Sequence, residues 1–513
     1  EPGRNTIFDP TTGDPATVVG RTPIAGNRIP TARISQQAAN LMQFSPRANA
    51  VDRSGVSFRR NFSTVGVEKF DAEQFNNRVD WFINEKSSLF GRYSFADFEK
   101  TAPGAFGEIA GGPALDNINF SGLSAVRNQS LALGYTRMWS PTLISEFRFG
   151  YMRYRVNVLP GGLGTSPAAD AGIPGLNRDD FFTSGMPGVF IQGDAGFNFG
   201  YSLGTNQCNC PLDQKEEQFQ WIGNTTWIKG NHTFKFGGDV RFAKNLRVPS
   251  DAHRSGELSF SPQFTGTVAA PGASAQQGLG FATFLLGEVT GFRRFVSPTT
   301  DAAERQKRFF WYGQDTWRVT QKLTLNYGLR WEQIFPETVK RPGNGGQLDL
   351  TTGEIAVFGI GDVSDHGLQE MKWTNFAPRF GVTYRLTDKT VIRAGYGWSY
   401  ALGTFGSIFG HNVTQNLPVL AVQELNRPND FSGVFGLNQG PSNPVFLQPD
   451  ARGRFSLPNG VSGKARPQNL KMPLVMAHNV TLQHQFTKDT SVEVAYVGNQ
   501  GRNQFAGDGP NIN

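Results

Sequence analysis

Long hydrophobic runs are missing from this sequence of 513 residues. No stretch of 18 apolar residues occurs, and the most apolar short segment is FATFLLG at 281–287. A transmembrane helix needs about 20 such residues, so a helical membrane span is excluded. A β-barrel is not excluded, because its strands alternate apolar and polar residues and average to a polar mean hydropathy, which is −0.36 here.

Cysteine and concentrated positive charge are also scarce. Cys208 and Cys210 are the two cysteines, too few for a disulfide scaffold. The formal net charge is +7, yet charged residues make up only 18% of the chain, and basic runs do not exceed pairs such as Arg59–Arg60. Because nucleic-acid binding needs a concentrated basic stripe, we expect no nucleic-acid partner.

Enzyme motifs are absent as well. The sequence contains no pair of histidines bracketing a glutamate and no phosphate-binding loop ending in Lys-Ser or Lys-Thr. GGLG at 161–164 lacks the strand–helix unit of a dinucleotide site. The six histidines are dispersed and are interpreted as ordinary polar residues, with His478 and His484 predicted to point the same way along one strand: His232, His253, His366, His411, His478 and His484. We predict no catalytic residue, no metal and no cofactor.

Two small groups of residues could in principle bind a metal ion. Cys208 and Cys210, in QCNCPLD, are interpreted as a local disulfide in an oxidising compartment, with free thiols and metal capture as the alternatives. A metal site needs about four ligands, which two cysteines do not supply. Asp362, Asp365 and His366 could take a cation, but the favoured interpretation is solvated loop residues.

Glycine and phenylalanine are abundant instead, at 61 and 43 residues. Several segments alternate apolar and polar residues with period two. In LTLNYGLRWEQ, Leu325, Tyr327 and Leu329 point to one side of an extended chain, whereas Asn326 and Arg330 point to the other. HTFKFGGDVRF, APRFGVTYRLT and LISEFRFGY repeat the pattern. We therefore predict β-strands with one apolar and one wet face, with aromatics on the apolar face and glycines on the wet face or in loops.

The predicted strands come in pairs joined by short polar turns, each pair interpreted as a β-hairpin. Six pairs surround the turns NEKS, SPT, KGN, TQK, TDK and TKD: 71–83 with 87–98, 128–139 with 142–157, 215–228 with 231–244, 306–319 with 322–336, 375–386 with 389–402, and 476–486 with 490–500. A seventh pair is predicted in GELSFSPQF and VTGFRRFV, with FATFLLG as a turn or helix between them, which gives about 14 strands. The connections 158–214, 337–374 and 403–475 are long and rich in Gly, Pro, Asn and Ser.

Short turns on one side and long loops on the other are typical of outer-membrane barrels. The fold class predicted is all-β, a transmembrane antiparallel β-barrel with long extracellular loops and short periplasmic turns. Strands of about 10–15 residues are long enough to cross the hydrocarbon layer when tilted. Aromatics near strand ends are expected to form interfacial girdles, the alternative being that they cap the core of a soluble β-sandwich array: Trp81, Trp139, Trp227, Trp317, Trp331 and Tyr400.

The wet face is the most functional surface that the pattern predicts. Charged residues on it would line the lumen and set selectivity, or, as we favour, hold the wall through ladders of Arg with Asp or Glu across strands. Substrate contacts are expected in the long loops, for instance 158–214 and 403–475, and the residues that make them are unknown. The residues predicted to face the lumen are Arg78, Asp80, Arg92, Glu146, Arg148, Lys235, Asp239, Arg241, Arg330, Glu332, Arg379, Arg385 and Arg393.

Blocks of the sequence resemble Oar-like TonB-dependent receptors of the bacterial outer membrane. They occur in one order from residue 7 to residue 503: IFDPTTGDP, RTPIAGNRIPTARIS, CNCPLDQKEEQFQWIGNTTWIKGNHTFKFGGDVRF, GFATFLLG, FFWYGQDTWRVTQKLTLNYGLRWEQ, NFAPRFGVTYRLTDKTVIRAGYGWSY and NVTLQHQFTKDTSVEVAYVGNQGRN. Any one block is only a good β-hairpin, and the resemblance rests on the set.

The resemblance implies a 22-stranded barrel around an N-terminal plug. It also implies uptake of large or scarce substrates, with energy supplied by TonB, ExbB and ExbD in the inner membrane. The expected partners are outer-membrane lipid, the TonB–ExbB–ExbD complex through a plug, and an unknown transported substrate. No plug or TonB box is visible before residue 7, and the family's last strands are absent. We interpret the chain as an internal piece of the barrel. The expected division is an extracellular loop region with a short helix (1–70), barrel strands and loops (71–503), and the start of the next loop (504–513).

Three other classes share part of the pattern. A passive porin-like or adhesin barrel has the same alternation and loops but no plug upstream, and it is the runner-up. An outer-membrane hydrolase requires acidic and histidine residues clustered at the loop end, which the sequence does not show. A soluble β-sandwich or propeller array predicts stable folding without detergent.

Overall fold

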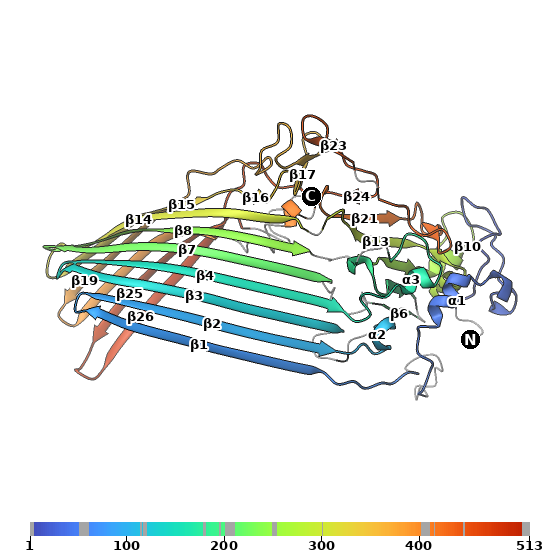
Figure 1. Ribbon diagram of the computed structural model, residues 1–513, viewed down its shortest axis with the longest axis horizontal. Helices are drawn as coiled ribbons and strands as arrows, with labels where there is room; N and C mark the ends of the chain where they lie inside the picture. Colours follow the sequence, from blue (N-terminus) through green and yellow to red (C-terminus); the bar gives the residue numbers. More distant parts are fainter. Residues whose placement is uncertain are drawn as a thin grey trace.

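The computed structural model consists of a wall of long strands with a set of small sheets at one end (Figure 1). The short hairpin turns gather at one end of the wall, here called the short-turn end, and the long connections at the other, the long-loop end. The residues that the structure describes are 5–50, 61–112, 115, 121–177, 181–193, 196–200, 211–248, 254–299, 301–401, 411–414, 416–444 and 447–504.

The wall is one antiparallel sheet whose twelve long strands are paired in chain order. A short strand, β16 (Thr338–Val339), adds to β14 as a thirteenth. All six predicted hairpins are confirmed. The long strands are β1 (Lys69–Asn84), β2 (Ser87–Ala102), β3 (Gly122–Ser140), β4 (Leu143–Pro160), β7 (Leu212–Lys229), β8 (His232–Val248), β14 (Ala303–Arg318), β15 (Leu323–Ile334), β19 (Phe376–Thr387), β20 (Thr390–Tyr400), β25 (Leu474–Gln485) and β26 (Ser491–Arg502).

The register sorts the side chains of the wall onto two faces. Residues directly opposite each other in neighbouring strands share a face. One row across β3, β4 and β7 pairs Leu133 with Phe149 and Phe149 with Trp221. The next row along the strands pairs Gly134 with Arg148 and Arg148 with Ile222. We call the face of Phe149 the apolar face and the face of Arg148 the polar face.

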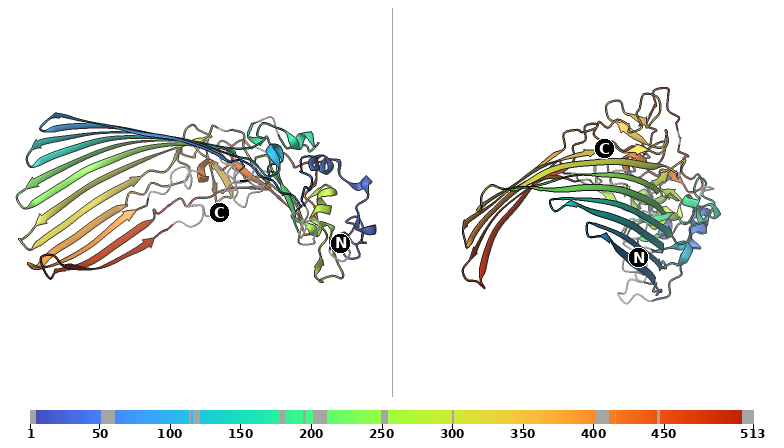
Figure 2. Two further views of the ribbon diagram at one scale, coloured as in Figure 1. Left: turned by 90° about the horizontal axis from the view of Figure 1, so that it is seen from below. Right: turned by 60° about the vertical axis from the view of Figure 1, so that its left-hand side comes forward.

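Several strands are longer than the 10–15 residues expected. β3 has 19 residues, which at about 3.3 Å per residue corresponds to roughly 60 Å. The sheet curves into an arch along this length (Figure 2). Because the extra residues continue the same ladders beyond the predicted limits, the wall extends toward the long loops as regular sheet.

The long connections are not structureless, because they form small sheets at the long-loop end (Figure 1). The largest has six strands in the order β24-β21-β13-β9-β5-β6. Two others pair β10 with β11 and β12 with β22. The last has three strands in the order β17-β18-β23. Their bounds are β5 (Gly188–Ile191), β6 (Phe197–Phe199), β9 (Glu257–Phe260), β10 (Thr267–Val268), β11 (Ala275–Gln276), β12 (Glu288–Val289), β13 (Gly291–Val296), β17 (Gly346–Asp349), β18 (Glu354–Val357), β21 (Ala421–Asn426), β22 (Phe435–Gly436), β23 (Arg454–Ser456) and β24 (Val461–Ser462).

The seventh predicted hairpin is wrong as a part of the wall. Its two segments form β9 and β13 of the six-stranded sheet, so the wall has two long strands fewer than the 14 expected. Pro262 ends the first segment by removing a ladder donor, and Phe292, Phe295 and Arg294 of the second are all buried. A barrel strand keeps one face against lipid, whereas these strands are enclosed by protein.

Short helices complete the long-loop end. FATFLLG forms most of α4 (Gly280–Leu285), which settles the expectation of a turn or helix there. In the described ranges, no helix is long and apolar enough to cross a membrane. The other helices are α1 (Gln36–Met42), α2 (Gly107–Ala110), α3 (Pro167–Asp170) and α5 (His411–Thr414), with 3-10 turns at Ala25–Asn27, Thr31–Arg33, Phe181–Thr183 and Pro262–Thr265.

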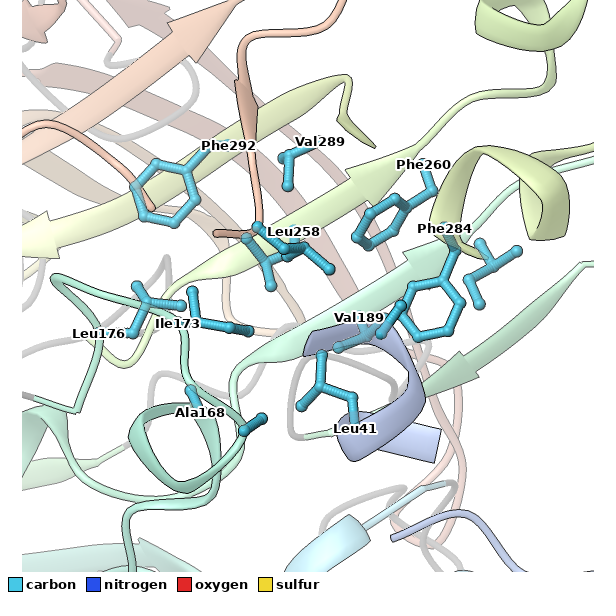
Figure 3. Packing of buried hydrophobic residues seen from close by; sticks show 14 of the residues in the cluster. Leu41, Ala168, Ile173, Leu176, Val189, Leu258, Phe260, Phe284, Val289 and Phe292 are labelled. Carbon is cyan, nitrogen blue, oxygen red and sulfur yellow. The ribbon is translucent and has the colours of Figure 1, made fainter. Parts of the chain in front are cut away.

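A hydrophobic core joins these small elements (Figure 3). It brings together α1, α3, α4 and the six-stranded sheet through residues that lie far apart in the chain. Phe284 of α4 is at its centre, with its ring edge-to-face against Phe260 at 5.1 Å and Phe199 at 6.3 Å. Leu41 of α1 and Leu258 of β9 are buried in the same core. The loops at this end are therefore a packed unit rather than independent excursions.

Replacing Phe284 with alanine should destabilise this unit by about 3–5 kcal/mol, the usual loss for a buried aromatic. Amide hydrogen exchange should accelerate in β5, β9 and α1, while the long strands keep their protection. Phe181, whose side chain is half exposed, supplies the control, because F181A should change exchange little. Equal acceleration in both variants would contradict this account of the core.

Candidate functional site

All thirteen residues predicted to face the lumen lie on the polar face. The register shows it strand by strand: Arg78 is opposite Arg92, Arg241 opposite Gln220, and Arg393 opposite Thr383. Nine of the thirteen are cations and four are acids. The period-two prediction for these strands is confirmed as a placement on one face, while the role of the residues stays a prediction.

The four acids predicted on this face pair along strands rather than across them. Each of the four carboxylates meets an arginine two residues away in its own strand. The ion pairs are Arg78–Asp80 at 2.7 Å, Arg148–Glu146 at 3.4 Å, Arg241–Asp239 at 2.6 Å and Arg330–Glu332 at 3.1 Å. The expected cross-strand ladders are therefore wrong for these four pairs, whereas Arg393 does pair with an acid of another strand, Glu493, at 3.7 Å. Residues i and i+2 share a face, so a single strand can neutralise its own charge without fixing a neighbour's side chain.

A shallow hollow on the polar face, of about 190 Å³, is lined by unmatched cations. Lys235 is opposite Gln314, Gln314 opposite Gly328, and Gly328 opposite Arg379, so one row crosses four strands. Gly328 supplies the space, because a Cβ there would lie 2.6 Å from the Gln314 side chain. Arg330 borders the hollow and is held by Glu332. The arrangement leaves positive charge directed at the space in front of the wall.

The long loops fold over the polar face at the long-loop end. Phe310 of the wall is buried there against Leu470 and Met472 of the last long connection. In β14, Glu304, Gln306 and Arg308 on the polar face are buried, whereas Arg305 and Lys307 on the opposite face are exposed. The polar face is therefore the face that the rest of the chain covers.

A buried polar network ties the loops to the wall. Arg466 is 3% exposed and Glu337 1% exposed, and the Nη1 of Arg466 donates to both Glu337 and, at 2.6 Å, to Gln369. On the wall side, Gln306 donates to the Glu337 carboxylate at 3.4 Å and accepts from the Nε of Arg308 at 2.6 Å. We call these five residues the Arg466 network. Its members come from β14 and three separate loop segments.

A second hollow, of about 500 Å³, lies among the loops beside the N-terminal segment. Arg21 lines it and donates to the carbonyl oxygens of Phe264 and Gly266. Arg33 lines it too and holds Asp9 in a two-bond pair, whose hydrogen bonds lower the pKa of the Asp9 carboxyl. Burial raises the pKa of Glu288 on another side of the hollow. None of its lining residues belongs to 158–214, and four of the thirteen belong to 403–475: Asn429, Phe431, Ser432 and Gly433.

The histidine side chains that the structure describes show no catalytic arrangement. His232 lies on the apolar face near the short-turn end, with Nδ1 2.6 Å from the Asp315 carboxylate and its ring stacked on Trp317. Tyr327 donates to the same carboxylate at 2.8 Å. His478 and His484 share the apolar face, as predicted, because their partners Tyr396 and Thr390 lie on it.

The other candidate ligands stay apart or undescribed. Nδ1 of His366 lies 3.1 Å from the Ser364 hydroxyl. Within the described part of the chain, no group of three or more His, Cys, Asp or Glu side chains could hold a metal ion. Cys208, Cys210 and His253 lie outside the described residues, as does the side chain of His411. The disulfide stays a prediction.

The predicted girdle residues fall at two levels of the wall. Trp81, Trp139, Trp227 and Trp317 lie within three residues of a short turn. Trp331 and Tyr400 lie toward the long-loop end: Trp331 is three residues before the last residue of β15, and Tyr400 ends β20. The ring nitrogen of Trp331 donates to the carbonyl oxygen of Trp373 in a long loop.

Sequence patterns predicted the wall residues of this site but missed the Arg466 network. Arg466, Glu337 and Gln369 belong to irregular segments without a period, and they are 129 and 97 residues apart in their hydrogen-bonded pairs. A single sequence carries no signal for such contacts. Gln306 and Arg308 alternate with the exposed Arg305 and Lys307, and this period was the available hint.

Replacing Arg466 with methionine should lower the stability of the loop cover by about 3–5 kcal/mol, because the Glu337 carboxylate is left buried without its partner. Amide exchange across the segments around 337 and 369 measures the loss. The double variant R466M/E337M should recover most of it, since an apolar pair replaces an ion pair at little net cost. The exposed Arg341, which pairs with Asp301, is the control: R341M should shift stability by no more than about 0.5 kcal/mol. A double variant as unstable as R466M would contradict the prediction.

Comparison with known proteins gives one family and several distant structures. The sequence matches the family described as Outer membrane beta barrel domain over residues 2–513. No curated protein sequence matches the chain. Similar solved structures include a mutant of the ferric enterobactin receptor PfeA from Pseudomonas aeruginosa, with 10% identity over 89% of this chain and 45% of that chain and a TM-score of 0.39.

Two further structures match at the same level. They are the outer membrane transporter YddB from Escherichia coli (12% identity, 88% of this chain, 42% of that chain, TM-score 0.39) and the ferric yersiniabactin uptake receptor FyuA from Yersinia pestis (7%, 89%, 48%, 0.38). The chain spans less than half the length of each of the three. The family match covers nearly all of the sequence and agrees with the two-faced antiparallel wall. The chain belongs to the Outer membrane beta barrel domain family, and its location is the cell outer membrane.

Proposed function

We propose that this chain forms part of the barrel of an Oar-like TonB-dependent receptor that moves large or scarce substrates across the outer membrane. The sequence blocks that resemble that family support the proposal, since the four hairpins they contain all lie in the wall. In this proposal a plug couples the barrel to TonB, ExbB and ExbD, and no catalytic chemistry or cofactor is involved.

The observation that carries the proposal is that the wall is open. Its strand order ends at β1 on one side and β26 on the other, and neither has a second neighbour among the described strands. A sheet edge in lipid leaves backbone N–H and C=O groups unpaired, which costs several kcal/mol for each group. Both edges of the wall therefore need partners, which in this proposal are further strands of the complete protein. A barrel wider than twelve strands has room for a plug inside it.

The polar face is proposed as the lumen wall of this barrel. The four carboxylates predicted to face the lumen are each matched by an arginine of the same strand. Of the other five cations, Arg393 lies 3.7 Å from Glu493, and four have no ion pair among the described residues. Lys235 and Arg379 border the hollow around Gly328. Such a surface suits an anionic or strongly polar neighbour, either a plug or a cargo passing it. Substrate contacts are assigned to the loops, with the hollow beside Arg21 and Arg33 as the first region to probe.

A conductance measurement separates energised transport from a passive pore. The complete protein, inserted in a planar lipid bilayer, should show no steady conductance, because a plug closes the lumen. A passive barrel would conduct continuously. In cells, binding to the surface should persist without TonB, whereas uptake should stop.

Two results would overturn the proposal. One is a steady open conductance of the complete protein. The other is a reading frame that joins a signal peptide directly to this region, with no plug of about 130 residues. Heat-modifiable migration on gels is the control in both experiments, because it shows that the barrel is closed and correctly folded.

A further inference from the structure

Seven cations lie on the apolar face near the long-loop end. They occupy five adjacent strands, and all are exposed, whereas inward neighbours such as Val126, Val156, Glu216 and Asn245 are buried. We call them the cationic belt: Arg127 on β3, Arg153 and Arg155 on β4, Lys215 on β7, Lys244 on β8, and Arg305 and Lys307 on β14.

The level of the belt matches the outer border of a membrane. In β7, Lys215 is twelve residues from Trp227, and in β14, Arg305 is twelve residues from Trp317. Twelve residues span about 40 Å along a strand, or about 30 Å along the membrane normal at the usual tilt. The apolar band of such barrels is about 25 Å tall. With Trp227 and Trp317 at the periplasmic interface, the belt lies just above the hydrocarbon on the extracellular side.

The register of the belt forces like charges together. Arg127 is directly opposite Arg155, and Arg155 is directly opposite Lys215. Like charges in opposite positions destabilise a sheet, and here three stand in one row. An anion that bridges them removes the repulsion. The same row on β2 carries Asp97, which pairs with Arg127 at 2.5 Å.

The acids around the belt do not neutralise it. Three carboxylates reach its members: Asp97 pairs with Arg127, Asp213 lies 3.4 Å from Lys215, and Glu217 lies 3.9 Å from Lys244. Among the described residues, no hydrogen bond or ion pair engages the side chains of Arg155, Arg305 and Lys307. Seven cations against three acids leave a net charge of +4 on this part of the face. Exposed pairs of this kind are worth at most about 1 kcal/mol, so the cations are free to take another partner.

Directly below the belt, toward the short-turn end, the apolar face is hollowed. A depression of about 440 Å³ runs across the same strands and is lined almost entirely by apolar atoms. Gly223 and Gly238 are opposite each other at its floor, between Phe147 and Trp311. These glycines lie on the apolar face, contrary to the expectation that strand glycines occupy the wet face. Trp221, with its ring against Phe149 at 5.5 Å, forms one wall.

We propose that the cationic belt binds the phosphate groups of an anionic lipid in the outer leaflet, with one acyl chain of that lipid in the hollow over Gly223 and Gly238. The inference depends on the outer-membrane location and not on energised transport. Arginine offers paired donors that match phosphate oxygens, and basic clusters at a membrane border are typical sites for anionic headgroups. The Tyr151 hydroxyl, bonded to Glu217 at 2.9 Å, marks the border between the two parts of the site.

The test compares lipids on the complete protein purified in detergent. Lipid A, which carries phosphates, should bind and be retained in native mass spectrometry. Its dephosphorylated form should bind at least tenfold more weakly. Inorganic phosphate at millimolar concentration should compete poorly, because it cannot occupy the hollow. Equal retention of the two lipids would overturn the assignment of phosphate to the belt.

Two variants separate the headgroup from the acyl chain. The triple variant R127Q/R155Q/K215Q should lower lipid A affinity at least tenfold. G223L should fill the hollow and lower affinity several-fold, and it should fold, because a Cβ at Gly223 meets Phe147 at an ordinary 3.6 Å. Inorganic phosphate binding should fall in the triple variant but not in G223L.

Each variant has a matched control. K322Q/K389Q/K488Q removes the same charge from exposed lysines at the short-turn end and should leave affinity unchanged. G313L adds the same side chain to an apolar-face glycine that has open space around it and should also bind normally. Heat-modifiable migration verifies folding of all four. Unchanged affinity in R127Q/R155Q/K215Q, or equal losses in a variant and its control, would overturn the proposal.

Discussion

The pairing of every backbone polar group within the sheet is the constraint on which this structure depends. Lipid offers no hydrogen-bond partners, so each N–H and C=O of the wall must bond to a neighbouring strand. Pairing fixes the register, and the register fixes which side chains share a face. A slip of one residue would place Arg148 in the row of Phe149 and Trp221. The separation into a polar and an apolar face thus follows from the ladders rather than from any single contact.

Charge on the polar face is arranged so that it does not compete with this register. An arginine and an acid two residues apart in one strand neutralise each other wherever the neighbouring strand lies. A cross-strand ladder would be lost whenever pairing shifted. The Arg466 network works differently, because it joins β14 to loops that have no ladder to hold them. Its buried charges are satisfied only in one arrangement of those loops, which specifies where the cover sits.

Sequence alone predicts the wall well and its surroundings poorly. The hairpin of β14 and β15, for example, alternates apolar and polar residues with period two and has a short polar turn. Both features are local signals in the sequence. The segment around Phe292 and Arg294 shows similar residues, yet it is enclosed on both sides, and enclosure cannot be read from a short apolar run. Arg466 pairs with Glu337 across 129 residues, and Gly238 lies beside a predicted wet-face glycine while facing the other way. Each of these wrong or missing predictions depends on a contact between distant parts of the chain, or on a shift of a single residue between the two faces.

The extra length of the strands accounts for two surfaces at once. Beyond the apolar band, β14 continues as sheet, and its side chains keep alternating: Glu304, Gln306 and Arg308 inward, Arg305 and Lys307 outward. The inward residues there are buried, Glu304 beside Asn245 of β8 and Gln306 against the loop residues Phe335 and Glu337, so they cannot turn to neutralise the outward ones. Outward cations in turn lie above the hydrocarbon, where the cost of charge in lipid no longer applies. If β14 ended at the membrane border, it would have neither the buried residues that contact the loops nor the cations of the cationic belt. The same ladder of backbone hydrogen bonds positions both sets of side chains.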